Sequence, residues 1–429
     1  MKNPTRREFI ASSAAALALQ PLLASGKEPP QDVDISVRIR GLLLGGAICD
    51  ALGGPIEFQP TPAIQGLPDP PKIWKEGEKL DPSARTATAA RLRLRSYKDL
   101  RPGTESYGQW NYHSLPGTIT DDTRHKLILL HALHTADHAD HWPISVRDLA
   151  SSYLKWPQST AVEGRPGYPD LAKDWLEEIQ FSARWVLGER DPAQALPPER
   201  LWQSLPTCCG QMIMPPLAAI YGGRPEEAYR AAYHMGFFDN ASAKDLNAAL
   251  IAGLAQALVT PVIGGDPRAA FQTVLKTMRE TDPFRFRKIR WSERAVDRWL
   301  NLALKFAHDA DGEPARLFAS LEKEFATSAM WEAQLVIVVI FSCLELAGYD
   351  PLAALQLCME WGHDSDSYAQ LAGVFIGALH GPDIFPAAWQ DAVITRLRAD
   401  HGTDLNEESL FLTHLHQLST KRVLIAEAK

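Results

Sequence analysis

Beyond its N-terminal segment, the chain has the alternation of apolar and polar positions that is typical of helices. Several helix-length spans are rich in Ala, Leu and Glu, with apolar residues at the spacing of an α-helix. These spans are residues 146–156, 170–188, 225–235, 245–259, 266–281, 291–309 and 333–348. The apolar run 335–341 has the composition of a buried strand, but it lies inside a helix-length span and is too short to cross a bilayer. We therefore expect a core helix there and an all-α fold.

Two irregular stretches interrupt the helical pattern. Residues 60–118 and 157–168 are rich in Pro, Gly and Arg, and the first also contains several aromatic residues. Irregular segments of this length are usually functional or disordered, and we expect a lid. No repeat or linker divides residues 35–420, which predicts a single domain.

The first residues resemble a twin-arginine export signal. Arg6 and Arg7 precede Phe9 and an apolar run that extends to Leu23, which is too short for a membrane span. We expect residues 1–26 to be a signal peptide and the twin-arginine translocase to be a partner. The protein would then be periplasmic or secreted, without stable insertion in a membrane. The alternative is an ordinary basic N-terminus.

Composition and charge narrow the classes of function. The chain is 45% hydrophobic and 22% charged, which fits a globular enzyme with a large core. Its net charge of −8 at pH 7 argues against nucleic acid as a partner. The five cysteines are odd in number and follow no pattern, so they indicate no disulfide framework.

Two short acidic motifs carry the clearest chemistry in the chain. Residues 120–123 read TDDT and residues 364–367 read DSDS, and a helical stretch follows each motif. Taken singly, each motif is explained by capping, because helix N-termini favour carboxylates and hydroxyls. Together they offer the carboxylates of Asp121, Asp122, Asp364 and Asp366, and hard divalent cations prefer oxygen ligands. We expect the motifs to meet in space and form a cage for two metal ions.

A third element lies at the start of the domain. Residues 41–58, GLLLGGAICDALGGPIEF, predict a small-residue helix that stops at Gly-Gly-Pro. Gly41 and Gly45 are four residues apart, so a second helix could approach this one closely. Glu57 follows the helix stop, where its carboxylate could project into a cavity. The alternative is a surface glutamate in a loop.

These three elements resemble the motifs of the ADP-ribosylglycohydrolases in their order and wide separation. The family has a helix ending Gly-Asp-Ala-x-Gly with a Glu soon after, then Gly-x-Trp-Thr-Asp-Asp-Thr, then Gly-Gly-Asp-Thr-Asp-Thr before a Gly-x-x-x-Gly-Ala helix. The corresponding segments here are residues 49–57, 117–123 and 361–378. The resemblance implies a compact single-domain orthogonal helical bundle around a binuclear metal site. It also implies cleavage of N- or O-glycosidic bonds to ADP-ribose.

Several positions depart from the family pattern. Ile119 stands in place of Trp and His363 in place of Gly, while Ser365 and Ser367 replace threonines and keep the hydroxyls. Residues 208–218, CCGQMIMPPLA, lack the Asn and Arg of the family's substrate loop. The family's histidine further along is replaced near residues 238–240. Retained metal ligands with an altered substrate loop imply the same chemistry, with a different substrate as an alternative.

The residues and the resemblance together predict roles for individual side chains. The expected ligands of two divalent cations, Mg²⁺ or Mn²⁺, are Thr120, Asp121, Asp122, Asp364, Asp366 and Ser367. The expected catalytic residues are Glu57, which activates water or protonates the leaving group, and Asp122. The resemblance implies substrate contacts at Gly53, Gly117, Cys209, Gly210 and His363. Asp50 is expected to be a structural hydrogen-bonding residue near the site.

Three functions remain open from the sequence. The first is an exported metal-dependent glycohydrolase that cleaves a ribosyl bond of an ADP-ribosylated protein or small molecule. The second is the same machinery acting on another nucleoside or sugar derivative. The third is a non-catalytic metal- or ligand-binding protein. Release of ADP-ribose from a modified protein separates the first two, and cation binding without turnover would support the third.

Overall fold

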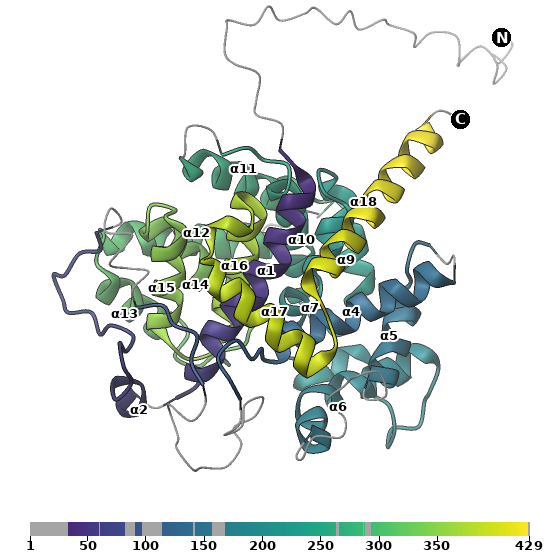
Figure 1. Cartoon of the computed structure of the whole chain (residues 1–429), viewed down its shortest axis with the longest axis horizontal. Coiled ribbons are helices and arrows are strands. Elements are labelled where there is room, and N and C mark those ends of the chain that lie inside the picture. The colour runs from purple at the N-terminus through teal and green to yellow at the C-terminus, as the bar shows by residue number, and fades with distance from the viewer. Residues whose placement is uncertain are drawn as a thin grey trace, which may run out of the picture. The chain divides into compact units, whose positions relative to one another are not determined.

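The computed structural model describes residues 33–59, 61–81, 91–96, 114–139, 142–156, 168–262, 266–285, 287 and 293–427. From Val33 onwards the chain forms one compact unit (Figure 1). The predicted signal peptide and much of the predicted lid (residues 60, 82–90, 97–113 and 157–167) lie outside the described residues. Those two predictions therefore remain predictions.

The described residues form helices, with one isolated β-bridge between Thr207 and Glu332 and no strand. The all-α prediction is confirmed. The α-helices are α1 (Ile35–Gly53), α2 (Thr61–Gln65), α4 (Asp121–His138), α5 (Val146–Lys155), α6 (Tyr168–Leu187), α7 (Cys209–Ile213), α8 (Pro215–Ile220), α9 (Pro225–Met235), α10 (Ala243–Ala257), α11 (Pro267–Glu280), α12 (Ala295–Ala310), α13 (Pro314–Glu324), α14 (Ala333–Leu346), α15 (Pro351–Trp361), α16 (Ser365–His380), α17 (Ala387–His401) and α18 (Leu405–Glu427). Short 3-10 helices are η1 (Gly54–Ile56), η4 (Pro198–Ser204) and η6 (Pro382–Ile384).

Helices α1 and α16 form the central pair of the unit (Figure 1). Their backbones are in contact because glycines face each other across the pair. A Cβ atom added to Gly377 would lie 1.9 Å from the carbonyl oxygen of Gly41, and one added to Gly45 would lie 2.3 Å from that of Gly373. The close approach that the glycine spacing predicted is therefore confirmed. It brings the C-terminal end of α1 to the N-terminal end of α16.

Helix α14 packs against α16 and is buried along residues 333–344. The ambiguous apolar run 335–341 lies inside it, so the prediction of a core helix is confirmed. A helix that is buried on every side has no polar face, and this explains why the run also had the composition of a strand. Among the described residues, no helix combines the length and apolar character needed to cross a bilayer.

Candidate metal centre and active-site cavity

The first acidic motif lies at the start of α4, where Asp50 of α1 fixes the backbone. The carboxylate of Asp50 accepts hydrogen bonds from the backbone N–H of Thr120 (2.9 Å) and of Thr123 (3.0 Å). The Thr120 hydroxyl accepts from the Asp122 N–H at 3.3 Å and caps the helix. Asp50 is therefore the structural hydrogen-bonding residue that the sequence predicted, and capping explains part of the first motif.

The second acidic motif lies at the start of α16, against the end of α1. Asp364 is the residue before the helix and Asp366 is in its first turn, which is the placement that lets alternating aspartates converge. The Ser365 hydroxyl donates to the carbonyl oxygen of Gly53 at 3.0 Å. The Ser367 hydroxyl donates to Oδ2 of Asp122 at 3.1 Å, so a hydrogen bond joins the two motifs directly.

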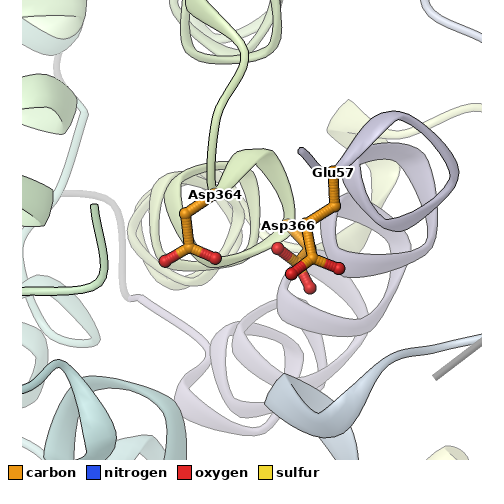
Figure 2. Close-up of side chains that lie close together, drawn as sticks. All are labelled: Glu57, Asp364 and Asp366. Atoms are coloured by element: carbon orange, nitrogen blue, oxygen red, sulfur yellow. The ribbon is translucent and has the colours of Figure 1, made fainter. Parts of the chain in front are cut away.

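Five carboxylates meet where these helix ends converge. Oxygens of Glu57, Asp364 and Asp366 lie within 4.8 Å of one another and form what we call the Glu57 triad (Figure 2). Oxygens of Asp121, Asp122 and Asp366 satisfy the same distance and form the Asp121 triad. Asp366 belongs to both triads. The prediction that the two acidic motifs meet in space is confirmed, while the roles of their residues stay predictions.

The oxygens of this cluster fit divalent cations. Oδ1 of Asp122, Oδ2 of Asp364 and Oδ1 of Asp366 are buried and have no hydrogen-bond partner in the described part of the chain. Buried polar atoms in folded proteins almost always have a partner. Unpaired carboxylate oxygens that converge on one space are the ligands that Mg²⁺ and Mn²⁺ prefer.

Burial and mutual repulsion raise the pKa of these carboxyl groups. Burial is the largest cause for each, and it raises the pKa of Asp121 to about 6 and that of Asp364 to about 7. For Glu57, Asp122 and Asp366, burial and then neighbouring carboxylates raise the pKa well above its ordinary value. A cluster of this kind requires protons or cations to offset its charge.

His125 and Lys126 of α4 adjoin the cluster, and neither was predicted from the sequence. Lys126 is 3% exposed, and its Nζ donates to the carbonyl oxygen of Asp122 at 2.9 Å and to Oε1 of Gln370 at 2.6 Å. His125 lines the cavity, and its Nδ1 lies 3.0 Å from the Tyr153 hydroxyl. Burial lowers the pKa of His125 to about 3, so the ring is neutral. The spacing of Lys126 four residues after Asp122 was a usable signal, because such residues share a helix face.

A cavity of about 230 Å³ opens beside the carboxylates. Carboxylates line one side of it, and thiols, thioether and aromatic rings line much of the rest. The lining residues are Glu57, Phe58, Asp121, Asp122, His125, Trp202, Thr207, Cys208, Cys209, Met212, Trp331, Asp364 and Ser367. The cavity thus combines a polar floor suited to hydroxyl groups and cations with an apolar wall suited to a ring.

Two aromatic residues of the wall have a left-handed backbone conformation. The φ angle is 47° at Phe58 and 50° at Trp202, which is rare for bulky side chains. Glu178 accepts the Trp202 N–H at 3.0 Å, and Asn240 donates to the carbonyl of the residue before Trp202 at 2.8 Å. Phe58 meets Trp331 edge to face at 6.3 Å between ring centroids. Strain that the surrounding structure holds in place is common at functional sites.

The predicted substrate-contact residues have different surroundings. Cys209 lines the cavity. Gly210 does not line it, and its N–H donates to Oδ1 of Asp239 at 2.9 Å. Gly53 does not line the cavity either. A Cβ atom added to it would lie 2.5 Å from the carbonyl oxygen of Ser365. The two glycines therefore allow close packing at the rim of the site.

Gly117 and His363 contact other parts of the protein. An added Cβ at Gly117 would lie 3.0 Å from the backbone of Ala392 in α17. Nε2 of His363 lies 2.7 Å from Oε1 of Glu322, and neither Gly117 nor His363 lines the cavity. The cause for His363 is its positive φ of 57°, which turns its side chain away while its carbonyl oxygen accepts the Phe58 N–H at 2.8 Å.

The chain is similar to known proteins over most of its length. The family model described as ADP-ribosylglycohydrolase matches residues 31–420. A solved structure titled "ADP-ribosylglycohydrolase-related protein complex" is similar, with 16% sequence identity, coverage of 89% of this chain and 99% of that chain, and a TM-score of 0.49. No curated protein matches the sequence.

Proposed function

The chain belongs to the ADP-ribosylglycohydrolase family, and from this premise we propose that it hydrolyses a ribosyl glycosidic bond with the help of two divalent cations. One observation carries the proposal: two carboxylate triads share Asp366 beside a cavity and leave buried oxygens unpaired. The ligands would be Asp121, Asp122, Asp364 and Asp366, with the hydroxyls of Thr120 and Ser367. Mg²⁺ or Mn²⁺ bound there supplies a Lewis acid that can hold vicinal ribose hydroxyls and lower the pKa of a water molecule.

Glu57 is suited to move a proton in this reaction. It is half-buried and lines the cavity, as Asp121 does, but it follows the end of a helix, whereas the aspartates lie at helix starts. Its carboxyl can take a proton from the attacking water or give one to the leaving group. Cleavage at a ribosyl carbon develops positive charge on the sugar, which the surrounding carboxylates stabilise.

The leading substrate is an ADP-ribosylated protein or small molecule. The test is to incubate the purified protein with a side-chain ADP-ribosylated protein and Mg²⁺ or Mn²⁺, and to measure released ADP-ribose by chromatography. Chelation should abolish the release, and the Asp366→Asn variant should lack it because it removes the carboxylate that both triads share. Cation binding without turnover on any glycoside would support a non-catalytic protein instead.

A second candidate substrate is a smaller riboside with a flat, uncharged aglycone. The aromatic wall of Phe58, Trp202 and Trp331 favours this candidate, because rings stack on or against such side chains. The cavity volume of about 230 Å³ also lies below the roughly 300–1,000 Å³ of sites for drug-sized ligands. Nucleosides assayed beside the ADP-ribosylated protein decide between the two by their relative kcat/KM.

We also propose that the protein is exported by the twin-arginine translocase. The support is the Arg6-Arg7 pair ahead of the apolar run that ends at Leu23. Cell fractionation should recover the protein in the periplasm or the medium. A chain in which both arginines are changed to lysine should stay in the cytoplasm.

A further inference from the structure

Among the residues that the structure describes, no carboxylate accepts a hydrogen bond from the buried ammonium of Lys126. Its side chain is almost fully buried, and Nζ donates to two neutral oxygens, the carbonyl of Asp122 and the amide Oε1 of Gln370. A buried ammonium costs free energy unless opposite charge offsets it. Here the offset must act through space, from the carboxylates of the metal centre.

The position of Lys126 is not symmetric with respect to the two triads. Burial lowers its pKa, and the carboxylates that raise it again are, in order of strength, those of Asp122, Asp50, Asp121 and Asp366. The hydrogen bond from Nζ goes to the backbone of Asp122, which belongs to the Asp121 triad and not to the Glu57 triad, whereas Asp366 belongs to both. This contact places the ammonium on the side of the Asp121 triad.

The hydrogen bonds of Lys126 fix this position. Through Nζ, the side chain links the first turn of α4 to Gln370 in α16. Its stem also passes Gly46 of α1, where an added Cβ would lie 3.8 Å from Cε of the lysine. These contacts with α1, α4 and α16 hold the ammonium beside the carboxylate cluster.

We propose that Lys126 is a built-in counter-cation that makes the two cation sites unequal, so that the site at Asp364 and Asp366 fills first and the site at Asp121 and Asp122 fills at higher cation concentration. The physical cause is repulsion between the fixed ammonium and a divalent ion, which acts strongly over short distances in a partly buried site. Lys126 is therefore a positioning residue, and this inference rests on the proposed metal-dependent function.

The test is a Mn²⁺ titration of the metal-stripped full chain, followed by electron paramagnetic resonance of the free ion and by calorimetry. Wild-type protein should bind in two steps. Lys126→Met, which removes the charge and keeps a stem, should tighten the second step by about tenfold or more, as expected for loss of a nearby like charge. The first step should change less. Lys126→Gln, which is neutral but polar, should give the same result. Thermal unfolding of each variant will show whether it folds.

Gln370→Met provides the matched control. It removes one acceptor of the ammonium and leaves the charge, so the two steps should stay as far apart as in the wild type. The inference is wrong if the wild type binds both ions with equal affinity, or if the neutral variants leave the ratio of the two affinities unchanged. Either result would leave the proposed metal dependence standing. Failure of the wild type to bind any Mn²⁺ would overturn the proposed metal dependence as well.

Discussion

Glu57 differs from the aspartates of the cluster in how the backbone presents it. Asp121, Asp122 and Asp366 belong to the first turn of a helix, and Asp364 directly precedes one. Glu57 instead follows η1, and its side chain reaches the shared space from the end of α1 (Figure 2). A half-buried carboxylate that lines the cavity and lies outside the helix starts can exchange protons with water and substrate, so this residue is the best placed for acid–base chemistry.

Glu57→Gln should lower turnover by about 10²–10⁴-fold, the usual contribution of a general acid or base. The amide keeps the shape and an oxygen ligand but cannot transfer the proton. Turnover should be measured beside cation content by elemental analysis. Loss of one cation together with activity would contradict this role and make Glu57 a metal ligand.

Asp239 should give a pH dependence of stability that is separate from that of the carboxylate cluster. Burial raises its pKa to about 7, against hydrogen bonds from Asn247 and the Gly210 N–H that lower it. An unfolded aspartate titrates near pH ~4, so between about pH 4 and 7 the folded state holds a proton that the unfolded state has lost. The contribution of Asp239 to stability is therefore lost as the pH rises through this window.

Asp239→Asn should remove this dependence while keeping an acceptor for Gly210. Its free energy of unfolding, relative to the wild type, should rise from about pH 4.5 to about pH 7.5 by an amount on the order of a few kcal/mol. Urea unfolding at several pH values measures the difference. Parallel pH profiles for the two proteins would show that Asp239 titrates normally.

Among the helices, the contact between α1 and α16 sets the geometry of the carboxylate cluster. The start of α16 carries Asp364 and Asp366, and its position depends on the glycine contacts further along the same helix. Any change that separates the two helices should therefore move the carboxylates as well. Stability and the proposed cation affinity should be coupled through this pair.

Gly377→Ala tests the coupling. The added methyl would lie 1.9 Å from the Gly41 carbonyl oxygen, so the helices must separate, at a cost of about 1–3 kcal/mol or more. Mn²⁺ affinity should fall together with the melting temperature. Gly46→Ala on α1 is the control, because its nearest obstacle is a side-chain methyl of Val374 at 2.9 Å, which can shift. Equal effects of the two variants would argue against a rigid backbone contact.

The helices also show how much of the fold could be predicted from the sequence. Glycine spacing predicted that a second helix could approach α1 closely but not that this helix is α16, and the polar caps predicted where α4 and α16 begin. Helix α15 was missed because nearly every position in it is buried, so it has no amphipathic period. The Lys126–Gln370 contact joins residues 244 positions apart. Such a contact depends on tertiary packing, as does the direction of His363, which its positive φ sets.

The carboxylate cluster should make the folding stability of the entire protein depend on cations. Five carboxylates held close together repel one another, and an ion that binds only the folded state stabilises it by about 2.7 kcal/mol at a hundredfold excess over Kd. The net charge of −8 adds a weaker, screened attraction for cations. The melting temperature of metal-stripped protein should therefore rise with Mg²⁺ or Mn²⁺ and fall again on chelation.

The size of this stabilisation should itself depend on pH. Without cations, burial raises the pKa of Asp121 to about 6 and of Asp364 to about 7, so the metal-free fold loses stability as the pH rises from about 4 to about 7. The proposed cations would bind the deprotonated carboxylates, so the gain in melting temperature should grow over the same window. Thermal unfolding with and without Mg²⁺ at about pH 5.5 and about pH 8 measures this, with Asp366→Asn as the control that lacks the shared ligand. A gain that is equal at both pH values would mean that protons and cations do not compete for the cluster.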